Sequence, residues 1–211
     1  MPPSVPASWA TSWERGSFAM LGLALQFLLE TFLGLFALAL LLRFFLQWLR
    51  APVRNPFSHF LAALTNWIVL PARRVIPGLW GLDLATVVLA WLTEVVLILA
   101  TYWLKGASLG PAVGTSLVLI GFLGVVQLAK LSLWILMVAV VAQAILSWVS
   151  PYSPVMPLMN SLVRPFLRVF QKRIPPVGNV DLSPLFVLVA CQLLLFVIAW
   201  LEGAVSRAII A

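Results

Sequence analysis

Four ionisable side chains stand inside long apolar runs of this sequence: Glu30, Arg43, Glu94 and Lys130. A charged side chain at the middle of a bilayer costs about 2.5–3.5 kcal/mol on insertion scales, so each of these residues needs a reason to be there. Carboxylate and ammonium groups in apolar surroundings can form ion pairs that dock helices together. They can also carry protons or cations across a membrane.

An internal repeat relates these residues to one another. The segment 48–84 returns in weaker form at 148–182, and the Asp-Leu pair at 83–84 recurs 98 residues later. Pro, Trp and Asp residues recur in the same order and register in both copies, and these shared residues, or marks, indicate a duplication. The marks of the first copy are Trp48, Asn55, Pro56, Arg73, Arg74, Pro77 and Asp83. Those of the second are Trp148, Pro154, Arg164, Lys172, Arg173, Pro175 and Asp181.

The repeat suggests partners for the intramembrane residues. Glu30 and Lys130 each lie 18 residues before the tryptophan of their copy, and Glu94 corresponds to Gln192. We hypothesise that Glu30 pairs with Lys130, and Glu94 with Gln192, where the two repeats dock. A proton or cation pathway is the alternative, and snorkelling of the long side chains to the surface is a third interpretation. Snorkelling suffices for Arg43, which is near the end of its run.

Composition places the chain in a membrane. The 211 residues are 63% hydrophobic and 9% charged, and the mean hydropathy is +1.10, whereas a soluble domain has about 25% charged residues. We predict an all-α membrane protein with four transmembrane helices at 24–46, 84–104, 126–148 and 184–201. Residues 115–125 form a membrane-associated lead-in that either spans the membrane or lies on it.

The repeats divide the chain into five parts. We predict a flexible tail at 1–17, repeat one at 18–105, a linker with the lead-in at 106–125, repeat two at 126–203 and a tail at 204–211. Each repeat contains a short amphipathic helix that lies in the membrane interface. The first begins at Asn55-Pro56 and stops at Pro71. Pro157 and Pro165 make the second shorter or broken. Asp83 and Asp181 cap the following spans, or form a paired functional site.

The formal charge of +7 is unevenly distributed. Nine of the thirteen basic residues lie in or beside the two repeated segments. This distribution is typical of the positive-inside rule rather than of nucleic-acid binding. We therefore expect these segments at the cytoplasmic face of the plasma (inner) membrane, in contact with anionic lipids, and both termini outside. The two repeats then share one orientation and are related by an axis along the membrane normal.

Motifs for catalysis and cofactor binding are absent from the sequence. His59 and Cys191 are the only residues of their types and are far apart, so no cofactor and no metal site is expected. No phosphate-binding glycine motif and no nucleophile elbow occurs. We expect a protein that is not an enzyme.

The marks taken together resemble the YggT family of integral membrane proteins, called YlmG in plastids. The resemblance covers about residues 24–201 and is to the two-repeat form of Gram-negative bacteria. It implies a four-span plasma-membrane protein without established enzymatic activity. Family members are linked to tolerance of osmotic and potassium stress, to cell division, and in chloroplasts to haem attachment. Two departures are Trp67, where a proline would fit the family better, and Gln171, where a basic residue would.

Three functions compete at this point. The first is a non-catalytic factor in membrane homeostasis or assembly that acts through a basic cytoplasmic face. The second is a small cation channel or transporter for K⁺ or H⁺ that uses Glu30, Glu94 and Lys130; four spans enclose little pore volume, so it would form a homo-oligomer. The third and weakest is a membrane enzyme or haem-handling protein. Substitution of the basic residues separates the first from the second.

Overall fold

The computed structural model describes residues 8–52, 56–76, 78, 83–106, 113–150, 152–153, 155–172 and 181–210. These residues form helices and no strand. The helices are α1 (Ser8–Trp48), α2 (Pro56–Val75), α3 (Leu84–Leu104), α4 (Val113–Val149), α5 (Met156–Gln171) and α6 (Ser183–Ile210).

Four of the helices are long and apolar enough to cross a membrane: α1, α3, α4 and α6. The qualifying segments are Met20–Trp48, Leu84–Leu104, Gly114–Val149 and Ser183–Ile209. Each exceeds the roughly 20 residues that a bilayer requires. Large apolar side chains such as Phe196 and Trp200 are exposed on the outer surface, as a lipid environment favours. The predicted class, an all-α membrane protein with four transmembrane helices, is confirmed.

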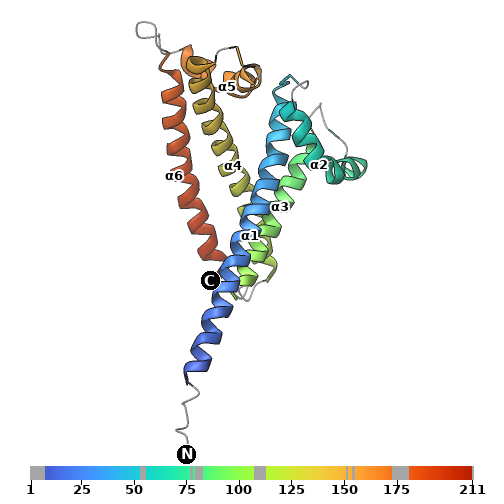
Figure 1. Cartoon of the computed structure of the whole chain (residues 1–211), viewed down its shortest axis with the longest axis vertical. Helices are drawn as coiled ribbons and strands as arrows, with labels where there is room; N and C mark the ends of the chain where they lie inside the picture. The colour runs from blue at the N-terminus through green and yellow to red at the C-terminus, as the bar shows by residue number, and fades with distance from the viewer. Residues whose placement is uncertain are drawn as a thin grey trace, which may run out of the picture.

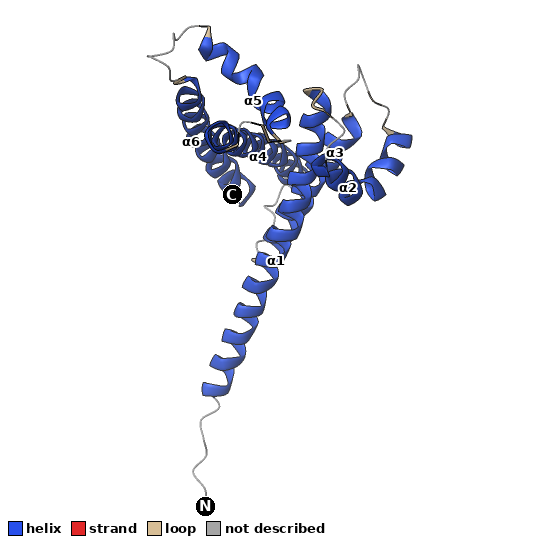
Figure 2. Ribbon diagram, turned by 45° about the horizontal axis from the view of Figure 1, so that its top comes forward, coloured by secondary structure: helices blue, strands red, loops and turns tan. Residues whose placement is uncertain are grey.

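The two repeats pack side by side in the same orientation. In repeat one α1 packs on α3, and in repeat two α4 packs on α6 (Figure 1). The helices α2 and α5 lie at the same end of the bundle, while α6 ends toward the other end. The first part of α1 projects beyond its neighbours (Figure 2). The parallel arrangement of the duplicated halves is the one that the repeat predicts.

The repeats meet where α3 packs on α4. The indole Nε1 of Trp91 donates a hydrogen bond of 2.9 Å to the carbonyl oxygen of Gly121. A Cβ at Gly124 would lie only 2.8 Å from the Val95 side chain and 3.0 Å from the Trp91 ring nitrogen. Glycine at this position therefore lets the two helices approach closely, as small residues do in membrane helix pairs.

Helix ends differ from the predicted spans in three places. The second transmembrane helix, α3, has the predicted bounds. The first helix begins at Ser8, within the predicted tail. The lead-in at 115–125 is continuous with span three in the single helix α4. The last helix runs through most of the predicted tail, because Val205 and Ile209 are buried against Ile98 and Ile120.

The two connecting helices also differ from the prediction. Pro71 does not stop α2, which continues to Val75 with the proline inside it. A proline removes only one backbone donor from a helix. The last turn of α2 is also held in place by Arg73, which binds Asp83. The helix α5 is shorter than α2, 16 residues against 20, but it is unbroken at Pro165. That α2 and α5 lie in a membrane interface stays a prediction.

Candidate functional site

A polar network fastens the end of α2 to the start of α3. Arg73 donates from Nε to Asp83 Oδ2 over 3.2 Å, and its Nη2 donates to the same oxygen. The hydroxyl of Thr86 also donates to this oxygen. Asp83 is buried and precedes α3, but its side chain makes no capping hydrogen bond, so the capping prediction is wrong for this residue. Its carboxylate instead binds the guanidinium group of Arg73.

The network continues onto α1. The Gln47 amide, in the orientation that satisfies both neighbours, donates to Asp83 Oδ2 over 3.1 Å and accepts from Arg73 Nη2 over 3.2 Å. One turn earlier, Arg43 donates to Thr65 Oγ1 over 2.6 Å and to Asn66 Oδ1 over 2.8 Å. Arg43 is only 9% exposed, so the snorkelling prediction for it is wrong. All three helices of repeat one are thus joined at this end.

The charges of the network set the protonation of Asp83. Burial alone would raise the pKa of its carboxyl, but the hydrogen bonds from Arg73 and Thr86 and the Arg73 charge outweigh burial. The pKa of Asp83 therefore lies below its ordinary value, and the group is ionised at neutral pH.

Repeat two carries the same network without its positive charges. Gln171 and Asp181, the equivalents of Arg73 and Asp83, are joined by a hydrogen bond of 2.8 Å from Gln171 Nε2. Asp181 also accepts the backbone N–H of Ser183 over 2.9 Å, as the capping prediction requires. Gln143, the equivalent of Arg43, donates to Asn160 over 2.8 Å. An amide thus replaces a guanidinium group at both positions of the second repeat.

The remaining predicted residues of the repeats divide into three groups. The exposed basic side chains at the end of the bundle that holds α2 and α5 form what we call the basic face: Arg50, Arg74, Arg164, Arg168 and Lys172. In the part of the chain that the structure describes, none of them forms an ion pair.

The other predicted residues of the repeats are not part of the basic face or lie outside the described ranges. Trp48 stacks on Phe44, Trp148 is 87% exposed, and Pro56 is the first residue of α2. The predicted residues Asn55, Pro77, Pro154, Arg173 and Pro175 lie outside the described residues.

A polar cavity of about 520 Å³ lies between the two repeats toward the opposite end. The four long helices all contribute to it. Three carboxylates line it: Glu30 of α1, Glu94 of α3 and Glu202 of α6. Gln127 of α4 and Lys105, directly after α3, also line it, together with Leu97, Ile98, Thr101, Tyr102, Leu123 and Ser206.

Hydrogen bonds in this region hold two of the three carboxylates. Lys130 Nζ lies 2.8 Å from one oxygen of Glu202, and Gln127 donates to its other oxygen over 2.8 Å. Glu30 accepts a hydrogen bond of 2.8 Å from Gln26, one turn earlier on α1. Glu94 is only 7% exposed, and no described residue gives it a hydrogen bond or an ion pair.

The predicted pairs between the repeats are wrong. Lys130 binds Glu202 of its own repeat and not Glu30, and Gln192 is exposed and makes no hydrogen bond to Glu94. Equivalent depth in a repeat does not fix the direction in which a helix face points. Glu202 is absent from the predicted site because the predicted span four ends at Leu201, directly before this charge, whereas α6 continues to Ile210. The spacing of Leu201, Val205 and Ile209 was the signal that the helix continues.

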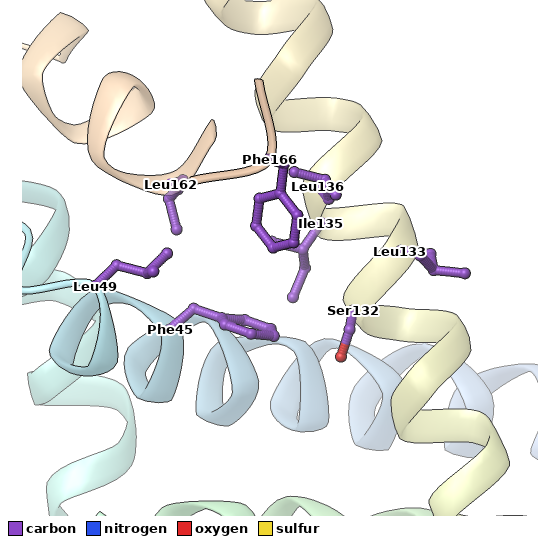
Figure 3. A pocket seen from close by; sticks show the side chains of 8 residues that line it. All are labelled: Phe45, Leu49, Ser132, Leu133, Ile135, Leu136, Leu162 and Phe166. Carbon is purple, nitrogen blue, oxygen red and sulfur yellow. The ribbon is translucent and has the colours of Figure 1, made fainter. Parts of the chain in front are cut away.

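An apolar pocket of about 80 Å³ separates the repeats nearer to the basic face. Figure 3 shows Phe45 and Leu49 of α1 across from Ile135 of α4 and from Leu162 and Phe166 of α5. Ser132 is the only lining residue with a polar side chain, and its hydroxyl donates to the Leu128 carbonyl. The pocket offers no reactive group. Across the described ranges, no set of His, Cys, Asp and Glu could hold a metal ion.

Comparison with known proteins decides the family. The family model described as CCB3/YggT matches residues 22–104 and 122–201, which correspond to the two repeats. The chain belongs to the YggT family. The two matched segments confirm the tandem duplication and the resemblance that the sequence marks carry.

Relatives of the YggT family match most of the chain. An uncharacterised protein of Pseudomonas aeruginosa is 37% identical over 179 residues, 83% of this chain and 89% of that protein. YggT of Escherichia coli K12 is 34% identical and covers 82% of this chain and 86% of its own length. A Vibrio alginolyticus protein encoded in the proC 3′ region is 34% identical over 86% of this chain and 97% of its own. No solved structure matches the chain.

Proposed function

We propose that this YggT-family chain is a non-catalytic membrane protein whose basic face binds anionic lipid headgroups, and that it serves membrane homeostasis or assembly through that face. One observation carries the proposal: exposed basic residues and an exposed aromatic stripe lie together at one end of the bundle. The face points to the cytoplasm by the positive-inside rule.

The aromatic stripe is a row of four exposed apolar side chains on α2, three of them aromatic. Phe57, Phe60, Leu64 and Trp67 are exposed at helical spacing, while Leu61 on another side of the helix is buried in the core. A helix with an outward apolar face beside basic residues is suited to lie at the boundary between headgroups and acyl chains. Arg74 follows directly at the end of α2, where headgroup phosphates would meet it.

The basic face leaves out two arginines that the sequence alone would include. Arg43 and Arg73 are held by Thr65, Asn66 and Asp83, so their substitution would damage the fold rather than test lipid binding. Each of the five exposed basic residues adds about 1 kcal/mol of attraction near an anionic surface. The attraction is electrostatic and weakens with added salt.

Lipid co-purification tests the proposal. The protein is purified from detergent micelles that contain phosphatidylglycerol and phosphatidylcholine, and the retained lipids are quantified at low and high salt. Phosphatidylglycerol should be enriched at low salt and lose its enrichment in the variant Arg74→Gln/Arg164→Gln/Arg168→Gln/Lys172→Gln. The control, Lys105→Gln/Arg207→Gln, removes charge away from the basic face and should keep the enrichment. Unchanged enrichment in the quadruple variant would overturn the proposal.

Cation transport is the second candidate, and the polar cavity favours it. The cavity reaches Glu94, which is near the middle of α3. Flux of K⁺ and H⁺ into liposomes that hold the purified protein tests this candidate. Flux lost in Glu30→Gln/Glu94→Gln would support it, and flux no higher than in empty liposomes would contradict it.

A further inference from the structure

We propose that the polar cavity between the repeats binds a small organic cation with a primary ammonium group, and that the Glu94 carboxylate is its main ligand. This goes beyond lipid binding, because the cavity and the basic face share no residue. It concerns the same cavity as the transport candidate but requires only binding. A ligand that binds without crossing the membrane would satisfy it.

The size of the cavity indicates a polyatomic ligand. Its volume of about 520 Å³ is within the roughly 300–1,000 Å³ typical of small-molecule sites. A bare metal ion instead needs several oxygen atoms drawn in to about 2.0–2.6 Å. The described part of the chain contains no group of three acidic, histidine or cysteine side chains that could supply such a cage.

The charge of the cavity region indicates a cationic ligand. Three carboxylates face two lysines, Lys105 and Lys130, so one negative charge is in excess when all five groups are ionised. The ammonium group of Lys130 is bound to Glu202. Lys105 is exposed at the end of α3.

Of the two cavity carboxylates that no lysine binds, Glu30 is exposed and Glu94 is buried. Glu94 is 7% exposed and has no hydrogen-bond donor among the described residues. The charge of Lys130 acts on it, but Lys130 is bonded to Glu202 and donates nothing to Glu94. The Glu94 oxygens are not among the fully enclosed, unpartnered polar atoms of the described residues, so a ligand in the cavity can reach them. A primary ammonium group would supply both a positive charge and up to three N–H donors.

The walls of the cavity suit the carbon part of such a ligand. Leu97, Ile98 and Leu123 line it beside the polar groups. Glu94 precedes Lys105 by 11 residues, so the carboxylate is about 16 Å along the helix from the α3 end. This places the proposed site deep in the bilayer and between the repeats, where many membrane proteins with duplicated halves bind their ligands.

Binding of n-butylammonium chloride to the full-length protein tests the inference. The protein is held in nanodiscs of zwitterionic lipid, and binding is followed by calorimetry and by the thermal unfolding midpoint. Butylammonium should bind and raise the midpoint, whereas KCl and n-butanol at the same concentrations should not. Glu94→Gln should weaken binding about tenfold or more. The control Asp181→Asn removes a carboxylate far from the cavity and should bind as the wild type does.

A second variant separates loss of the ligand group from loss of the fold. Leu97→Trp fills the cavity but keeps Glu94, and it should also abolish butylammonium binding while the unfolding midpoint without ligand stays near that of the wild type. Equal binding by wild type and Glu94→Gln would overturn the inference. So would an equal effect of KCl, which indicates a metal cation, or of n-butanol, which indicates apolar partition.

Discussion

At the scale of single residues, one carboxylate, Asp83, holds repeat one together at the basic-face end. Its side chain is 8% exposed and its guanidinium partner on Arg73 is 39% exposed. Repeat two performs the same task with Gln171 and Asp181, so the duplication has kept the geometry and dropped the positive charge. The structure thus contains its own comparison between an aspartate held by an arginine and an aspartate held by a glutamine.

Substituting Arg73 tests this fastening. Arg73→Ala should lower the free energy of unfolding by about 1–2 kcal/mol, because a buried carboxylate loses its cation while solvent near the exposed guanidinium reduces the effect. Arg73→Gln should cost less, since a glutamine at the equivalent place still reaches its aspartate. Denaturation in mixed micelles measures both. Arg74→Gln, one residue along and exposed, is the control and should change little; an equal loss there would contradict the assignment.

The pH dependence of stability follows from the lowered pKa of Asp83. The folded state holds the proton less tightly than the unfolded state, whose pKa is about 3.9. The stability from this group is therefore complete above pH 4–5 or so and is lost as pH falls through the lowered pKa. Asp181 has a lowered pKa of the same sign, because hydrogen bonds from Ser183 and Gln171 outweigh its burial. Unfolding midpoints from pH 7 to pH 3 should fall less steeply for Asp83→Asn than for wild type.

At the scale of helices, the contact between α3 and α4 joins the repeats. Trp91 binds the backbone at Gly121 and covers Gly124, so the closeness of the two helices depends on the missing side chain. The α1 helix also meets α4 and α5. At Gly124 the two repeats are too close for an added side chain.

Replacing Gly124 tests the helix contact. Gly124→Val should destabilise the protein by about 1–3 kcal/mol, because its Cβ would overlap Val95 and the Trp91 ring. Gly34→Ala is the control at an open position: apart from the neighbouring backbone of α1, nothing lies within 4 Å of the added Cβ, and alanine favours a helix. It should leave stability unchanged or slightly higher. Thermal unfolding followed by tryptophan fluorescence would show the difference, and equal effects would contradict the close contact.

At the scale of the whole molecule, the two ends of the bundle differ in charge. One end presents the basic face with α2 and α5, and the other opens into a cavity lined by three carboxylates. Because the repeats run in the same direction, both connecting helices share one end. The duplication therefore doubles the basic segments on one side of the bundle.

Labelling with an impermeant thiol reagent tests this arrangement in cells. On a Cys191→Ser background, His59→Cys and Tyr152→Cys should react from the same side, and Lys105→Cys from the opposite side. The first two should be protected in intact cells if the basic face is cytoplasmic. Reaction of His59→Cys and Tyr152→Cys from different sides would contradict the parallel arrangement of the repeats.

The sequence by itself determined the class, the duplication and the direction of the repeats. These depend on composition, on runs of apolar residues and on a register of 98, all of which are local or periodic properties of the chain. The bounds of α3 could also be predicted, since Asp83 and Lys105 mark both of its ends. The equivalence of Gln171 and Arg73 was visible in the register as well.

Only the tertiary structure decided which polar groups meet. Depth along a helix follows from residue number, but the direction of a side chain depends on how the helix is rotated against its neighbours. Lys130 therefore faces Glu202 and not Glu30, Arg43 is buried against α2, and Glu94 is left without a donor in a cavity that both repeats build. Helix packing fixes these rotations, and packing depends on contacts between residues far apart in the chain.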